Sequence, residues 1–201
     1  MIALNMRVVL NIVIAIMLAS IALFSTSLAT RSISFYLKYA PADAKSLCPV
    51  NAPNPRYEGI TLNEENGYFR YEHGEGYCEV VVWRSTVLGG DLIVFNEKIS
   101  LNTPWGFRQR YISYLFDGGW KHLEQVFPAI ARDMFISLYS RLRTSTSQKL
   151  KSGDTWTLFL EFPRYGQDVK VYFLTSTGDR TLIGTYRFIN GKFRFIPRGQ
   201  R

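Results

Sequence analysis

The two histidines are the residues best suited to acid-base or metal chemistry. His73 lies between Glu72 and Glu75 beside a glycine-rich turn, so an imidazole and a carboxylate could share a metal ion or a water molecule there. A zinc site needs three or four ligands, however, and no second histidine or cysteine follows at ligand spacing. His122 and Glu124 are two residues apart, which directs them to different sides of a helix. The sequence therefore predicts no metal ion and no other cofactor.

Serine and carboxylate chemistry have no clear signature in this chain. Ser85, Ser113 and Ser137 lack the glycine-flanked turn that exposes a nucleophilic serine. A glycosidase needs two carboxylates across a cleft, and only Glu161 and Asp133 have surroundings apolar enough to suggest a buried acid. The sequence thus identifies no catalytic residue, and an envelope hydrolase is the least favoured function.

Cys48 and Cys78 are the only cysteines, and we expect them to form a disulfide. Neither lies in a CxxC or histidine-rich context that would indicate a reactive thiol. A bridge that closes a loop of about 30 residues should contribute on the order of 3 kcal/mol to stability. Such a bridge is typical of an oxidising compartment.

Turn chemistry near the C-terminus predicts a row of cations on one sheet face. A two-residue Asn190-Gly191 turn places Arg187 opposite Arg194, and a two-residue Gly178-Asp179 turn places Lys170 opposite Arg187. A connection over residues 163–168 then sets Glu161 opposite Lys170.

Adjacent cations repel one another, so the row calls for a nearby carboxylate or an anionic ligand. We therefore interpret Lys170, Arg187, Lys192 and Arg194 as an anion- or partner-binding strip. The alternative is that these long side chains spread into water and bind nothing.

Four short apolar runs separated by glycine turns predict an antiparallel meander before residue 102. The predicted strands are Ile60 to Glu65, Tyr68 to His73, Tyr77 to Leu88 and Asp91 to Leu101. Residues 102–116 could form a short helix or an irregular connection.

Apolar residues from Trp120 to Leu142 recur at helical spacing, so we expect one long helix here. Pro128 either kinks this helix or divides it. A second meander follows, with strands over residues 155–162, 169–177, 180–189 and 192–197.

The expected class is therefore α+β: two antiparallel meanders of about eight strands with the long helix packed on the sheet. The helix should cover the face of the second meander that carries the following side chains: Trp156, Leu158, Leu160, Phe162, Val171, Phe173, Tyr186, Phe188, Phe193 and Phe195.

Residues 59–201 are expected to form a single domain, and residues 30–58 a proline-rich lead-in strap. Prolines at 41, 49, 53 and 55 argue against a helix or a central strand in the second part of the strap. The Cys48 bridge should pin it to the strand that contains Cys78.

The first 29 residues have the pattern of a signal peptide or a signal anchor. Arg7 precedes a largely apolar run, and Ser27 and Ala29 suit a cleavage site before Thr30. Residues 8–28 are also long enough to span a bilayer, which leaves membrane association through an uncleaved anchor open. Both readings predict export of the remaining chain, as a periplasmic, secreted or externally anchored protein.

Charge divides the exported part into two unlike halves. Residues 30–100 carry 7 Lys/Arg against 9 Asp/Glu, whereas residues 101–201 carry 16 against 7. A basic half favours an anionic partner, although a solvated basic face also serves solubility. Aromatic and basic residues alternate in the last strands, but period two sends the rings and the cations to opposite faces, which argues against nucleic-acid binding.

These observations favour an exported, non-catalytic domain that binds a protein partner or an anionic envelope component such as lipid. A carrier of a hydrophobic small molecule or lipid, held between helix and sheet, is the alternative.

Overall fold

In the computed structural model, Ser32–Arg201 form one compact unit. The structure describes residues 31–49, 58–74, 76–85, 87–101, 106–130, 132–142, 156–175 and 180–199. The predicted signal or anchor segment, residues 1–29, lies outside them. Within the described residues no helix combines the length and the apolar character needed to cross a bilayer.

Six antiparallel strands form the first sheet in sequence order. They are β1 (Ile60–Asn63), β2 (Tyr68–His73), β3 (Gly76–Ser85), β4 (Gly90–Ser100), β5 (Phe107–Phe116) and β6 (Trp120–Leu123). The predicted four-stranded meander is confirmed as β1 to β4. Its first turn requires Gly67, because this residue has φ +64° and a Cβ there would lie 2.7 Å from the Val82 carbonyl oxygen.

Two expectations for the middle of the chain are wrong. Phe107–Phe116 is strand β5 rather than a helix or an irregular connection, and Trp120–Leu123 is strand β6 rather than the start of a long helix. The helix α4 covers only Arg132–Leu142, after Pro128. Trp120 packs on one face of the sheet and Leu123 on the other. A spacing of three residues therefore fits a strand that packs against a core on each face as well as it fits a helix.

The second sheet has four antiparallel strands in the order β10-β9-β8-β7. They are β7 (Trp156–Glu161), β8 (Val169–Thr175), β9 (Arg180–Ile189) and β10 (Lys192–Pro197). This confirms the second predicted meander. Asn190 and Gly191 form the two-residue turn between β9 and β10 with φ of 50° and 76°.

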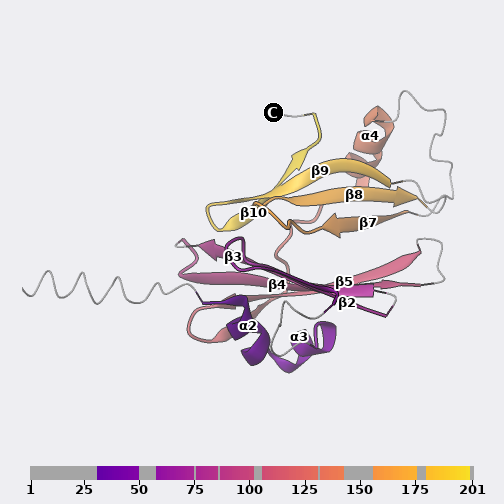
Figure 1. Cartoon of the computed structure of the whole chain (residues 1–201). Helices are drawn as coiled ribbons and strands as arrows, with labels where there is room; N and C mark the ends of the chain where they lie inside the picture. Colours follow the sequence, from indigo (N-terminus) through magenta and orange to yellow (C-terminus); the bar gives the residue numbers. More distant parts are fainter. Residues whose placement is uncertain are drawn as a thin grey trace, which may run out of the picture. The chain divides into compact units, whose positions relative to one another are not determined.

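The two sheets pack face to face around one hydrophobic core (Figure 1). Trp83 of β3 is 1% exposed, and its ring centroid lies 5.0 Å from that of Phe193 on β10. The Trp83 indole Nε1 donates a hydrogen bond of 3.0 Å to the Gln167 carbonyl oxygen. The prediction that a long helix covers this face of the second meander is thus wrong, because the first sheet covers it. Helix α4 contacts β9 instead, and Figure 1 shows it on the side of the second sheet away from the first.

Two short helices cover the other face of the first sheet. Helices α2 (Ile33–Tyr39) and α3 (Ala42–Leu47) lie in the segment predicted as a strap. Ser32 caps α2, since its side chain accepts a hydrogen bond from the Phe35 backbone N–H. Pro41 immediately precedes α3, so the prolines do not exclude a helix from the second part of the strap.

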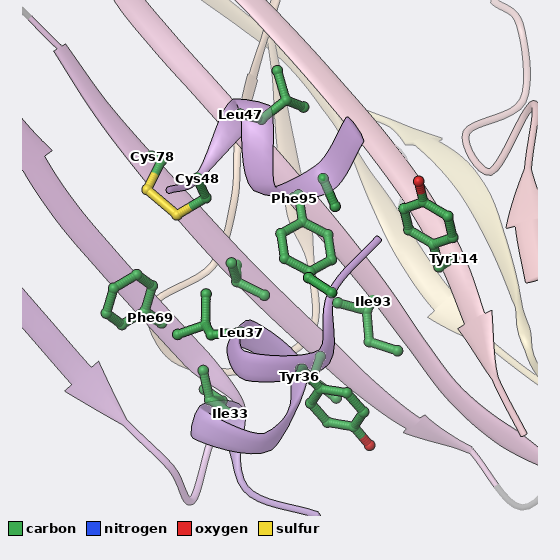
Figure 2. Close-up of a cluster of buried hydrophobic side chains, with 14 of the residues drawn as sticks. Ile33, Tyr36, Leu37, Leu47, Cys48, Phe69, Cys78, Ile93, Phe95 and Tyr114 are labelled. Atoms are coloured by element: carbon green, nitrogen blue, oxygen red, sulfur yellow. A yellow bond between two sulfur atoms is a disulfide. The ribbon is translucent and has the colours of Figure 1, made fainter. Parts of the chain in front are cut away.

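A second core forms between these helices and the sheet, as Figure 2 shows. Ile33, Tyr36 and Leu37 of α2 are buried against Phe69 and Phe95 of the strands. The predicted disulfide between Cys48 and Cys78 is confirmed and joins the end of α3 to β3. Strands β3 and β4 are therefore buried on both faces.

Candidate functional site

An apolar groove of about 730 Å³ opens beside β10 and is lined by residues of both sheets. Its apolar lining comes from the β3–β4 turn, β4, β5, β6, the segment after β6, and β10: Leu88, Leu92, Leu115, Leu123, Val126, Pro128 and Phe193. Glu124, Gln125 and Lys192 add exposed polar side chains to its border. Its volume lies within the range of typical small-ligand sites.

Strand β10 forms one edge of the four-stranded sheet, next to this groove. Residues that flank a two-residue turn exchange both backbone hydrogen bonds, so Ile189 and Lys192 are a hydrogen-bonded pair. The next pair, Phe188 and Phe193, is then non-bonded across the ladder. The backbone N–H and C=O of Phe193 consequently point away from β9, toward the open edge. Pro197 follows the same alternation, so its missing N–H costs no bond to β9.

Two of the predicted strip residues flank Phe193 on this edge. Lys192 and Arg194 are both exposed, whereas Phe193 is buried on the inner face. Among the described residues, neither cation forms an ion pair. The strip thus places two unpaired cations along β10.

The register of the strip is partly confirmed. Arg187 lies opposite Arg194, and Glu161 lies opposite Lys170, as predicted. The pairing of Lys170 with Arg187 is wrong, because Lys170 lies opposite Thr185.

The cause of the shift is a longer hairpin combined with a β-bulge. Arg180 pairs with Leu174, whereas a two-residue Gly178-Asp179 turn would pair it with residue 177. The register near the hairpin therefore differs from the predicted one by three residues. A bulge follows, in which Ile183 of β9 has no partner between Val171 and Tyr172. It reduces the register difference by one residue. The net shift of two keeps Lys170 and Arg187 on the same face but separates them along the strands.

Lys170 and Arg187, the two strip residues that do not lie on β10, both have carboxylate partners. The Lys170 ammonium lies 2.8 Å from Glu161, which also pairs with Arg180. Partial burial acts to raise the pKa of Glu161, but the two ion pairs outweigh it and lower this pKa below its usual value. The Arg187 Nε lies 3.3 Å from Asp168. Lys170 and Arg187 are therefore balanced by carboxylates of this chain and do not require an external anion.

A buried polar chain links the two sheets at the other edge, under β7. The side-chain amide of Gln109 on β5 donates a hydrogen bond of 2.7 Å to the Leu160 carbonyl oxygen. It also accepts a hydrogen bond of 3.0 Å from the Leu160 N–H. It also donates to Asn96, which in turn donates 2.8 Å to Glu79. Tyr68 donates 3.0 Å to the second Glu79 oxygen.

Glu79 is 3% exposed, and this burial raises its pKa to about 7 although its hydrogen bonds and Arg70 oppose the rise. Sequence reasoning missed this residue, as well as Asn96 and Gln109. The available signal was the alternation of side chains between the two faces of a strand. Glu79 shares a strand face with Val81 and Trp83, and Asn96 shares one with Leu92 and Val94. Polar residues at inward positions on neighbouring strands predict a buried network.

The other candidate groups are dispersed. The His73 ring packs on Tyr71, and the His122 ring lies 5.5 Å from Tyr114 at the border of the groove. In the described part of the chain neither histidine forms a hydrogen bond to a carboxylate or hydroxyl, and no group of acids, histidines and cysteines is placed to hold a metal ion. Asp133 is exposed on α4.

Comparison of the chain with protein-family models, with curated proteins and with solved structures gives no match.

Proposed function

We propose that this chain is an exported, non-catalytic binding domain and that the groove beside β10 is its binding site. The observation that carries the proposal is the apolar groove of about 730 Å³ at an exposed strand edge. Folding normally buries apolar side chains against other parts of the chain, so an open apolar groove indicates a ligand. The ligand is a protein partner or an anionic envelope component.

Two further features support this function. The buried Cys48–Cys78 disulfide fits a protein that folds in an oxidising compartment. Lys192 and Arg194 bring positive charge to the edge beside the groove, which suits an acidic ligand.

A carrier of a hydrophobic small molecule or lipid is the second candidate. The volume and apolar lining of the groove favour it, because both are typical of sites that hold hydrocarbon ligands. In this case the ligand lies between the sheets rather than between a helix and a sheet.

Photo-crosslinking in the native host tests the proposal. p-Benzoylphenylalanine at Val126, which lines the groove, should capture a ligand. The same residue at Met134, which is exposed on α4 and does not border the groove, is the matched control. An adduct specific to the Val126 position supports the proposal, and its mass separates a protein partner from a lipid. Absence of an adduct at Val126, or equal capture at both positions, contradicts it.

A further inference from the structure

We propose that the groove accepts an extended segment of a partner protein, which adds to β10 as a fifth strand of the second sheet. The inference rests on the proposed function, since it names the ligand of the same groove. It follows from the backbone direction at Phe193, from the apolar lining, and from the two cations of β10.

The backbone supplies the first part of the recognition. Phe193 directs one donor and one acceptor toward the open edge, as the register with Phe188 requires. An antiparallel partner strand would exchange both hydrogen bonds with Phe193 through a single residue directly opposite. Pro197 offers no N–H on that side, so the added pairing ends before it.

The groove supplies the second part. The partner residue opposite Phe193 projects to the same face of the sheet as Phe193, which is the inner face. It therefore enters a space lined by Leu92, Leu115 and Val126. An apolar, β-branched side chain suits this position. Glu124 at the border of the groove disfavours an acidic one there.

Charge supplies the third part. The partner residues next to the apolar one project to the outer face, opposite Lys192 and Arg194. Both cations are exposed, and acidic cross-strand neighbours stabilise such pairs. The recognised segment consequently has the pattern acidic, apolar, acidic at three consecutive positions.

Short synthetic peptides test this pattern. The acetylated and amidated peptide TTEIETT carries isoleucine between two glutamates and should bind the full chain in a fluorescence anisotropy titration. Its binding should shift the Phe193 amide resonance. Methylation of the isoleucine nitrogen removes the donor to Phe193 and should weaken binding at least tenfold, while all side chains stay the same.

Matched charge reversals test the role of the two β10 cations. Lys192→Glu with Arg194→Glu should weaken TTEIETT binding at least tenfold and should favour the peptide TTKIKTT instead. Lys170→Glu with Arg180→Glu is the control, because these cations lie on the same sheet, pair with Glu161 and are not opposite Lys192 or Arg194. The control should bind TTEIETT as the parent does.

Equal affinity for the methylated and unmethylated peptides, or equal loss in both charge-reversed variants, would overturn strand addition. If TTEIETT does not bind while Val126 still captures a ligand, strand addition is wrong and the groove remains a binding site for another ligand. If TTEIETT does not bind and Val126 captures no ligand, both strand addition and the proposed function are wrong.

Discussion

The two edges of the four-stranded sheet differ in how their backbone groups are satisfied. At β7, the Gln109 amide takes both the N–H and the C=O of Leu160, so a side chain from the other sheet stands where a neighbouring strand would be. At β10, Phe193 directs its backbone groups toward an apolar groove. At Leu160 the edge is closed to another chain, whereas the edge at Phe193 has free backbone groups next to an apolar groove. The difference supports the proposal that β10 is the edge that binds a partner.

Substitution of Phe127 should have the largest effect on the side of the molecule that carries the β10 edge. It is 4% exposed, and its ring centroid lies 4.6 Å from that of Phe193 and 5.1 Å from that of Tyr186. Phe127→Ala should lower the free energy of unfolding by about 3–5 kcal/mol, because it leaves a cavity between the sheets. Chemical denaturation measures the change. Val87→Ala, at a side chain that is 68% exposed, is the control and should change stability little. A stable Phe127→Ala variant would show that this ring does not support the core at β10.

Glu79 makes the closed side sensitive to pH. Its usual pKa is 4.5, and burial raises it to about 7 in the folded protein. The folded protein therefore keeps a proton that the unfolded chain releases, so the free energy of unfolding falls as pH rises through this window and levels off above it. The total fall should be about 3 kcal/mol.

Denaturation at pH 5 and pH 8 measures this fall. Glu79→Gln keeps a polar group of the same shape without the charge, and the dependence on pH over this window should largely disappear. Glu58→Gln, at an exposed position, should leave it in place. An unchanged slope in Glu79→Gln would assign the dependence to another group.

Gln109 sharpens the comparison between the edges. Gln109→Leu leaves the backbone groups of Leu160 and the Asn96 side chain without this partner, which should cost about 2 kcal/mol. Hydrogen exchange should accelerate at the Leu160 amide and stay unchanged at the Phe193 amide. Gln167→Leu is the control for the change of side chain, because Gln167 is exposed and its carbonyl, not its amide, accepts from Trp83. If Leu160 stays protected in Gln109→Leu, another group closes the edge.

Local patterns predicted the β1–β4 meander and the β9–β10 hairpin well. They missed strands β5 and β6, the register of the β8–β9 hairpin and the packing of the layers. Asn190-Gly191 set the register that pairs Arg187 with Arg194, because this dipeptide adopts the left-handed conformations that the turn needs. Trp120 and Leu123 misled, since their spacing fits a helix and also a strand that packs against a core on each face. The predicted pairing of Lys170 with Arg187 failed because the β8–β9 hairpin is longer than the two-residue Gly178-Asp179 turn that the sequence suggested. A bulge in β9, which leaves no mark in the sequence, then shifts the register back by one residue.

The candidate site was predicted only in part. Lys192 and Arg194 were identified from charge and register, and they do lie along the edge of β10. The groove beside them was not predicted, because it joins β4, β5 and the segment after β6 to β10 across more than 60 residues of sequence. No local pattern carries that contact.

The sequence by itself determined the disulfide, the strands β1 to β4 and β7 to β10, and the tight turn before β10. These depend on residue types and on spacings within a few positions, or on a pair of cysteines with no competitor. Only the tertiary structure decided that the first sheet covers the second, that Gln109 closes the edge at β7, and that β10 borders a groove. The reason is that many surfaces can bury an apolar face equally well, so the partner of each face is chosen by the packing of the whole chain.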